Sequence, residues 1–324
     1  MPSSPTSRDV AYAAGVSQST VSYVLSGKRF VAPKTRARVH EAMRALGYRP
    51  HASARALKSN RSRILGLIVP YHRCTDAPGQ YRYIVSLAAA CRRHGYELLV
   101  ISGEEGVEGM RRLTESALCD GILIMDVLDR DPRVEAARES RIPSVFIGFS
   151  HDADGVVATD TDFEAIGSGC AQRLHDAGHR RALVINPTSE HIMPMGFLHR
   201  FTQALDDRAS ALGLALESLE VARDFRSMRA ALDDYLAGAS PADAFIAAPA
   251  TSIDDAINVL TSSGRTPGVD ISIIGAGGSG DSPHTSVDYT HYDSDVSRVT
   301  GTAVGLLVDQ LEGILPLAGR EPER

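Results

Sequence analysis

The sequence predicts an α/β chain in which a small helical domain precedes a larger region of two lobes, each built on a parallel sheet. Residues 1–63 hold twelve Lys and Arg against two acidic residues, whereas the rest of the chain holds 22 against 38. From residue 62 onward, short apolar runs alternate with helical stretches, which is typical of parallel strands covered by helices. This alternation restarts beyond residue 160, which indicates a second lobe.

Composition limits the class of protein. The chain has 324 residues, 43% hydrophobic and 23% charged, which favours a globular protein over a disordered one. No apolar run approaches the roughly 20 residues of a membrane span. No apolar segment follows the opening MPSSPTSRD, so we expect a cytoplasmic protein without a membrane partner. The four cysteines form no CxxC pair, which favours buried thiols over a disulfide or a metal site.

The segment VAYAAGVSQSTVSYVLSG (residues 10–27) predicts two helices joined by a tight turn. Val10, Ala13 and Ala14 are expected on the inner face of the first helix. Gly15 suits the turn because it lacks a Cβ, and Ser17 is a natural N-cap for the second helix. At the spacing i, i+3, i+4, the inner face of the second helix carries Val21, Val24 and Leu25.

The outer face of the second helix is small and polar, as in a helix that enters the DNA major groove. Gln can make two hydrogen bonds to adenine, and Ser can donate or accept at several base edges. A helical hairpin of another kind is the alternative, but the basic charge of this domain supports an anionic polymer as its partner. The residues expected to read bases are Ser17, Gln18, Ser19, Ser22 and Tyr23.

A third helix is predicted to begin at Pro33, which suits a first helical turn, and to end at Gly47. The basic stretch RPHASARALKSN (residues 49–60) is too short for a stable isolated helix. It is either a linker or a segment that orders on DNA, with Leu57 and Ala54 as an apolar wedge in the minor groove. The expected domains are a helix-turn-helix domain at 1–49, a hinge at 50–61 and the two-lobed region at 62–324.

These motifs resemble a known family. DVAYAAGVSQSTVSYVLSG, TRARVHEAMRALGYRP and ARALKS are similar to the head of the lactose-repressor (LacI) family of bacterial transcription regulators. RILGLIVP, DGILIM, IPSVFIG, LHDAGHRRALVI and VDISIIG follow in the family's order. The resemblance implies that Gln18 and Ser19 read bases and that Leu57 is the wedge. Tyr23 stands where the family usually has Arg, so a bidentate guanine contact cannot come from that position.

The two-lobed region looks like a periplasmic-binding-protein-like clamshell. In such folds a ligand binds between the lobes, beyond the carboxyl ends of the strands. We expect strands at 63–70, 97–102, 121–125, 144–148, 181–186, 242–248 and 270–276, and helices at 83–96, 164–177, 200–212, 253–260 and 297–311, the last crossing back between the lobes.

The residues that follow these strands are expected to face the cleft. The resemblance implies that the family's polar ligand-binding groups are replaced: Gly148 stands for an Asp, and Phe197 for an Arg, with Phe201 as the aromatic residue four positions later. Pro249-Ala250 replaces an Asn-Asp pair, and Asp160 is retained as a structural turn residue. The expected effector-cleft residues are Tyr71, His72, Asp126, Phe149, Phe197, Phe201, Pro249, Ala276 and Tyr289.

These replacements bear on the effector. A buried hydroxyl without a partner costs about 1–3 kcal/mol, so we expect a ligand more apolar or aromatic than a simple sugar. The alternative is a degenerate cleft that serves dimerisation only. Gly275-x-Gly277-x-x-Gly280 matches a dinucleotide fingerprint, yet a loop, DSPHT, follows where that motif needs a helix. We therefore expect no enzyme activity, no cofactor and no metal.

The combined prediction is a repressor that binds a pseudopalindromic operator in double-stranded DNA as a homodimer. A small-molecule effector would alter the affinity by changing lobe closure, and both release and strengthening of DNA binding stay open. Basic side chains of the head would contact phosphates without reading sequence. These are Arg8, Lys34, Arg36, Arg55 and Lys58.

Overall fold

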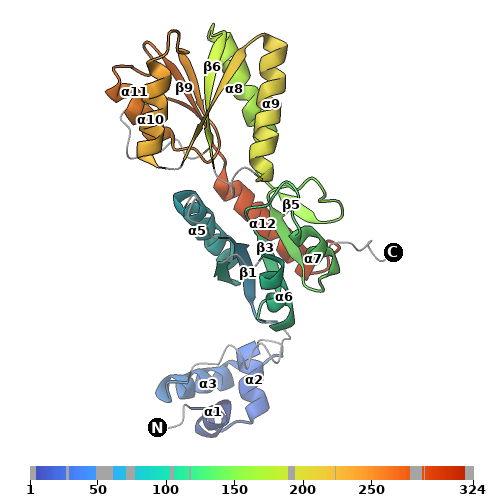
Figure 1. Cartoon of the computed structure of the whole chain (residues 1–324). Coiled ribbons are helices and arrows are strands. Elements are labelled where there is room, and N and C mark those ends of the chain that lie inside the picture. Colours follow the sequence, from blue (N-terminus) through green and yellow to red (C-terminus); the bar gives the residue numbers. More distant parts are fainter. Residues whose placement is uncertain are drawn as a thin grey trace. The chain divides into compact units, whose positions relative to one another are not determined.

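The computed structural model describes residues 5–26, 29–48, 61–70, 77–102, 106–116, 118–188, 194–222, 224–277, 287 and 289–317. The chain divides into two compact units, Met1–Ser62 and Arg63–Arg324, and Figure 1 labels their elements. The predicted fold class, a helix-turn-helix domain followed by two parallel-sheet lobes, is confirmed. No helix within the described ranges is long and apolar enough to span a membrane.

The first unit packs three helices around a small apolar core. Val10, Ala11 and Ala14 of the first helix are buried, whereas Ala13 is exposed. The prediction that Ala13 faces inward is therefore wrong. The sequence alone does not distinguish the alanines of this helix, and in the folded head Ala11 is the one that packs in the core with Val10 and Ala14. The helices are α1 (Ser7–Ala14), α2 (Gln18–Ser26) and α3 (Pro33–Ala45).

Local signals fix the ends of these helices. Thr6 and Asp9 form a capping box, in which the Thr6 N–H donates to the Asp9 carboxylate at 2.7 Å and the Asp9 N–H donates to the Thr6 hydroxyl at 3.4 Å. Gly15 ends α1 with a φ of 60°, in the left-handed region. The predicted N-cap of α2 is confirmed, because the Ser17 hydroxyl accepts the Thr20 N–H at 3.1 Å.

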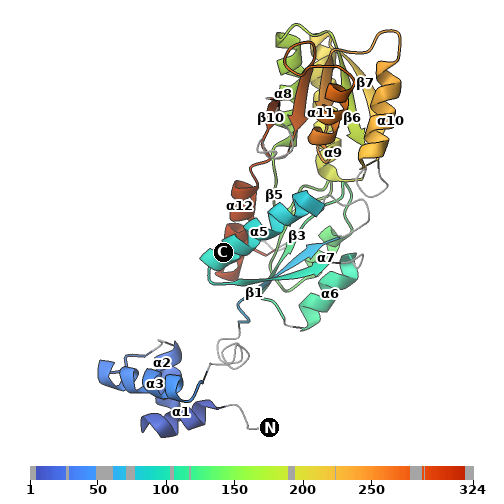
Figure 2. The ribbon, with the colours of Figure 1, turned by 90° about the vertical axis from the view of Figure 1, so that its left-hand side faces the viewer.

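The first lobe of the second unit is a five-stranded parallel sheet in the order β2-β1-β3-β4-β5. Helices α5 and α12 cover one face and α6 and α7 cover the other (Figure 1). Helix α12 comes from the far end of the chain and lies beside α5 (Figure 2), so the predicted return of the last helix is confirmed. The bounds are β1 (Ile64–Val69), α5 (Ala77–Arg93), β2 (Glu97–Ser102), α6 (Gly106–Ser116), β3 (Gly121–Ile124), α7 (Arg133–Glu139), β4 (Ser144–Ile147), β5 (Val157–Thr159) and α12 (Val296–Leu311).

The second lobe repeats this plan with the order β10-β9-β8-β6-β7, again all parallel. Helices α8 and α9 pack on one face of the sheet and α10 and α11 on the other (Figure 1). The bounds are α8 (Phe163–Asp176), β6 (Arg181–Pro187), α9 (Gly196–Leu212), β7 (Ala215–Val221), α10 (Phe225–Leu236), β8 (Ala244–Ala247), α11 (Ile253–Ser262), β9 (Ser272–Ala276) and β10 (Thr290–Tyr292).

Every predicted strand and helix is present, with small shifts of its ends. The sequence does not predict strands β5, β7 and β10 or helices α6, α7 and α10. The three missed strands are partly exposed along their length and carry no continuous apolar run. The predicted burial of free thiols is confirmed for Cys91, Cys119 and Cys170, while Cys74 lies outside the described residues.

Candidate functional site: a nucleic-acid interface and an inter-lobe region

The polar face of α2 is open at its N-terminal end. Gln18 and Ser19 are exposed, next to the N-cap Ser17. The Gln18 amide nitrogen donates to the Ser7 hydroxyl of α1 at 2.8 Å, and the hydroxyls of Ser17 and Ser19 lie 2.7 Å apart. The Gln18 amide keeps its oxygen and one N–H for a partner such as an adenine edge.

The C-terminal part of the same face is less open. Ser22 and Tyr23 are half-buried. The guanidinium carbon of Arg29 lies 5.6 Å from the centroid of the Tyr23 ring, which is within the range of a cation–π contact. The sequence gives no indication of this contact, because Arg29 falls beyond the predicted helix.

Basic residues of the head divide into two groups. Arg8, Lys34 and Arg36 are exposed, as phosphate contacts require. Arg38, which the sequence does not single out, has a structural role: its Nε donates to the Ala14 carbonyl at 3.1 Å and its Nη2 to the Gly15 carbonyl at 3.0 Å. These bonds satisfy carbonyl groups at the end of α1 and tie it to α3. Four other predicted contacts, Ala54, Arg55, Leu57 and Lys58, lie outside the described residues.

In the larger unit, Asp126 follows β3 with a φ of 51°, a rare conformation for a residue with a Cβ. The Gln80 side chain donates to its carboxylate and, at 3.0 Å, to the Pro70 carbonyl. Arg133 donates to the Asp126 backbone carbonyl at 2.8 Å. Asp126 is thus fixed at the carboxyl end of the sheet. Tyr71 and His72, expected beside it, lie outside the described residues.

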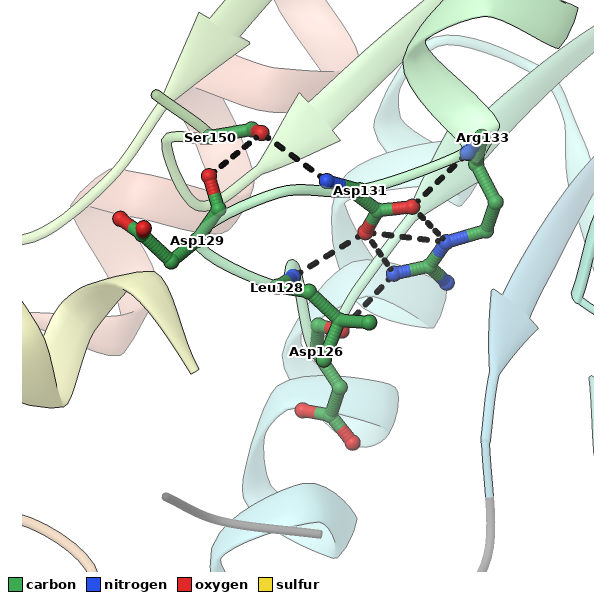
Figure 3. Close-up of polar contacts among 6 residues, drawn as sticks. All are labelled: Asp126, Leu128, Asp129, Asp131, Arg133 and Ser150. Atoms are coloured by element: carbon green, nitrogen blue, oxygen red, sulfur yellow. Dashed lines mark hydrogen bonds and ion pairs between the residues drawn. The ribbon is translucent and has the colours of Figure 1, made fainter. Parts of the chain in front are cut away.

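A buried ion pair organises the loop after β3 (Figure 3). The carboxylate of Asp131 accepts from Nε and Nη2 of Arg133 at 2.9 and 2.6 Å, and its side chain has no exposed surface. It also accepts the backbone N–H groups of Leu128 and Arg133 at 3.1 and 2.9 Å. The Ser150 hydroxyl accepts the Asp131 N–H at 3.2 Å and donates to the Asp129 carbonyl at 2.9 Å.

This loop is also the contact with the second lobe. The Asp129 N–H donates to the Pro194 carbonyl at 2.8 Å, and the Gly196 N–H donates to the Val127 carbonyl at 3.1 Å. A Cβ at Gly196 would lie 2.3 Å from the Phe149 carbonyl oxygen, so the start of α9 requires glycine at this close approach. Backbone hydrogen bonds therefore join the N-terminus of α9 to the first lobe.

Arg200 of α9 forms a second connection between the lobes. It pairs with the Asp160 carboxylate at the end of β5 and, at 2.9 Å, with Glu164. Its guanidinium carbon lies 5.1 Å from the Phe149 ring centroid and 5.8 Å from that of Phe163. Burial raises the pKa of Asp160 to about 6, although the positive charge of Arg200 lowers it. Asp160 also accepts the Thr161 N–H at 2.8 Å, which fits the predicted turn role.

The remaining predicted cleft residues differ in how far their side chains are exposed. Phe149 is 41% exposed, and Phe197 is half-buried with its ring centroid 5.2 Å from that of Phe163. Tyr289 is half-buried against the α10–α11 face. The expectation that the following three residues present a surface to a cleft is wrong: Phe201 and Ala276 are buried in the core between the sheet and α8–α9, and Pro249 is buried as well.

A cavity of about 190 Å³ lies in the second lobe, between the ends of β6 and β7 and the N-termini of α10 and α11. It contains none of the predicted cleft residues. The described residues hold no group of three or more His, Cys, Asp or Glu side chains that could bind a metal ion. The lining residues of the cavity are Pro187, Val221, Ala222, Asp224, Met228, Thr251, Ser252 and Asp255.

Comparison with known proteins identifies both parts of the chain. Residues 6–51 match the bacterial regulatory proteins of the lacI family, and residues 171–321 match the periplasmic binding protein-like domain. The chain belongs to the lacI family. This lacI-family chain is 28% identical to the HTH-type transcriptional regulator CelR of Thermobifida fusca, over 95% of its own length and 92% of that of CelR.

Solved structures agree with this membership. A transcriptional regulator CelR–cellobiose complex is 26% identical, with a TM-score of 0.66 over 97% of this chain and 95% of the other. The lac repressor dimer bound to operator and the anti-inducer ONPF is 21% identical and shares the fold, with a TM-score of 0.80 over 98% and 95% of the two chains. The lacI-family chain is therefore a DNA-binding transcriptional regulator with a periplasmic-binding-protein-like domain.

Proposed function

We propose that this regulator is a repressor that binds a pseudopalindromic operator as a homodimer, under the control of a small-molecule effector in the second unit. It would act in the bacterial cytoplasm, where operator DNA is found. The observation that carries the DNA-binding part is the capped, exposed polar face of α2 on a basic unit. Two such heads on a twofold axis would read successive major grooves.

The division of roles in the head follows from exposure. Gln18 and Ser19 would contact base edges, since their side chains are open, with Ser17, Ser22 and Tyr23 around them. Arg8, Lys34 and Arg36, with Arg55 and Lys58 of residues 49–60, would contact phosphates and make the affinity strongly dependent on salt. Leu57, with Ala54, would enter the minor groove at the centre of the operator.

Selection of bound duplexes from a random DNA library tests this proposal, with the full-length protein at a stated salt concentration. The expected result is a pseudopalindrome with a pyrimidine–purine step at its centre, where DNA is easily kinked. Enrichment of no motif, or of a motif without symmetry, would overturn the proposal.

An exposed apolar surface on the first lobe supports the homodimer. Tyr81 and Val85 lie one helical turn apart on α5, 67% and 48% exposed. Val100, on the edge strand β2, is 38% exposed. It points to the α5 face of the sheet, because Leu98, two residues earlier, packs in the same core as α5. Burial of this surface against a second copy would remove three apolar side chains from water.

Sedimentation equilibrium tests this interface. The wild type is expected to be a dimer, and a Tyr81→Glu, Val85→Glu variant is expected to dissociate at the same concentration. Val269→Glu is the matched control, because Val269 is 83% exposed at a turn of the second lobe. A monomeric wild type, or a dimer unaffected by the α5 substitutions, would contradict the proposed surface.

The proposed effector is apolar or aromatic. In support, Phe149 exposes part of its ring between the lobes, and the cation of Arg200 beside it is already paired with Asp160 and Glu164. Thermal unfolding with a panel of aromatic metabolites, a plain hexose and cellobiose tests this, and Phe149→Ser should abolish the stabilisation. Stabilisation by the hexose or cellobiose alone would contradict an aromatic effector. No stabilisation by any compound would favour the alternative, a degenerate cleft that serves dimerisation only.

A further inference from the structure

The pair of Tyr23 and Arg29 is the feature of the recognition unit that the roles above leave unexplained. Tyr23 occupies the second turn of α2, on the same side as Ser19 four residues earlier. Arg29 follows the end of α2, and its guanidinium carbon lies 5.6 Å from the Tyr23 ring centroid. The contact joins the recognition helix to the segment that leads into α3.

The two side chains differ in what they offer to DNA. Tyr23 lies on α2 and is half-buried, so its ring is less accessible than the side chain of Arg29. Arg29 is exposed, and its guanidinium makes no ion pair or hydrogen bond with any residue in the described ranges. No residue in the described part of the chain therefore occupies its five N–H donors, which can reach a partner such as DNA. A phenol has one hydroxyl, whereas a guanidinium can donate two parallel hydrogen bonds to the O6 and N7 atoms of guanine.

We propose that Arg29 reads a guanine at the edge of the operator half-site, and that the Tyr23 ring positions it for this contact. This inference rests on the proposed sequence-specific DNA binding, and it gives Tyr23 a positioning role in place of direct base reading. The ring attracts the planar cation and limits its orientations before DNA binds. Less side-chain freedom is then lost on binding than for a free arginine.

The same cation could instead contact a phosphate, and the two kinds of contact differ in their chemistry. A phosphate contact needs only charge, which lysine supplies, whereas the guanine contact needs the planar fork of arginine. It also needs the N7 acceptor of guanine, which 7-deazaguanine lacks. The operator selected by the wild-type protein provides the duplex for these comparisons.

Fluorescence anisotropy with this duplex, at fixed salt, tests the proposal. Arg29→Ala and Arg29→Lys should each lose discrimination at one symmetric pair of G·C positions, by roughly tenfold to hundredfold. The wild type should lose a similar factor when 7-deazaguanine replaces that guanine, and Arg29→Ala should lose little more. If Arg29→Lys keeps the full preference, or if 7-deazaguanine has no effect at any guanine, Arg29 contacts phosphate and the proposal is wrong.

Variants of Tyr23 test the positioning role. Tyr23→Phe keeps the ring and should retain the guanine preference, whereas Tyr23→Leu should lose a part of it and add little to Arg29→Ala in the double variant. Loss of the preference in Tyr23→Phe would show that the hydroxyl reads the base, against the proposal. Circular dichroism of each variant checks folding. If the wild type selects no motif, the proposed function fails; if it selects one that Arg29 does not affect, only this inference fails.

Discussion

The head and the two-lobed unit use polar side chains in opposite ways. In the head, Gln18, Ser19 and Arg29 are exposed and keep most of their hydrogen-bonding capacity. In the larger unit, two carboxylates near the ends of strands, those of Asp131 and Asp160, are each paired with an arginine. The head therefore offers polar groups to a partner, whereas the larger unit uses its own to hold loops and lobes together.

This difference separates DNA recognition, in the head, from the coupling of the two lobes, in the larger unit. The loop after β3 is fixed by the buried ion pair and hydrogen-bonded to the start of α9. Movement of the second lobe would therefore act directly on the first lobe. Variants that remove these pairs should change the stability of the larger unit strongly, while variants of the exposed polar face in the head should change DNA reading and leave stability unaffected.

The largest expected effect is that of Arg133→Ala. The Asp131 carboxylate would stay fully buried without its counter-charge, which should lower the free energy of unfolding by about 3–5 kcal/mol. Urea denaturation followed by circular dichroism measures this. The control, Arg229→Ala, removes an exposed pair with Asp233 at 3.4 Å and should cost less than about 0.5 kcal/mol. Equal losses of unfolding free energy in the two variants would show that the buried pair stabilises the unit no more than an exposed one.

The next effect depends on pH. The pKa of Asp160 is raised from 3.8 to about 6, chiefly by burial. Because the folded pKa exceeds the unfolded one, the folded state binds this proton more tightly, and its stabilising contribution is present below pH 4 and lost as the pH rises through 6. Between pH 7 and pH 4 the wild type should thus gain about 1–3 kcal/mol relative to Asp160→Asn, at about 1.4 kcal/mol per pKa unit.

Unfolding free energies at pH 7, 5 and 4 test this prediction. Glu164→Gln is the matched control: it removes the exposed carboxylate on the same arginine, and it should keep most of the wild-type pH dependence because burial, not the charge of Glu164, is the main cause of the raised pKa of Asp160. A wild-type pH profile parallel to that of Asp160→Asn would show that Asp160 does not titrate in this range.

A smaller effect is expected within the head. Arg38→Ala removes the donors to the carbonyls of Ala14 and Gly15, at about 1.5 kcal/mol, the low end for hydrogen bonds with a charged group, because the arginine is exposed. Hydrogen exchange of the α1 amides in the full-length protein should become faster. Arg36→Ala, on an exposed side chain of α3, should leave the exchange unchanged while weakening DNA binding in a salt-dependent way. If Arg38→Ala weakens DNA binding and leaves the hydrogen exchange of the α1 amides unchanged, Arg38 contacts a phosphate instead.

The sequence predicts the elements that are buried on both faces and misses those at the edges. Runs such as ILGLIV and GILI identify the central strands, because only apolar residues fit between two layers of helices. The edge strand β7 reads ALESLEV, in which most residues are exposed or half-buried and only Val221 is buried. The face of α2 was also predictable, since the positions of its valines fix which side chains point outward.

The inter-lobe region was less predictable for a physical reason. In the sequence, DRDPRV looks like a solvated group of charges. In the structure the same loop bonds to Ser150, which lies 19 residues from Asp131 in the chain and which only the fold brings close. Phe201 was expected at the cleft from the family resemblance, and Ala276 from its place after a predicted strand. Both side chains pack instead in the core between the sheet and α8–α9. Arg200 was missed because no local pattern announces its pairing with Asp160, 40 residues away.

In the proposed function, the side chains on the exposed face of α2 determine which DNA bases the protein prefers, and those of the larger unit do not. The most direct test compares duplexes selected from a random library by the wild type, Gln18→Ala and Arg229→Ala, at the same salt concentration. Gln18→Ala should relax the base preference at one symmetric pair of positions, whereas Arg229→Ala should select the wild-type motif. An unchanged motif for Gln18→Ala would remove this side chain from DNA reading and contradict the account.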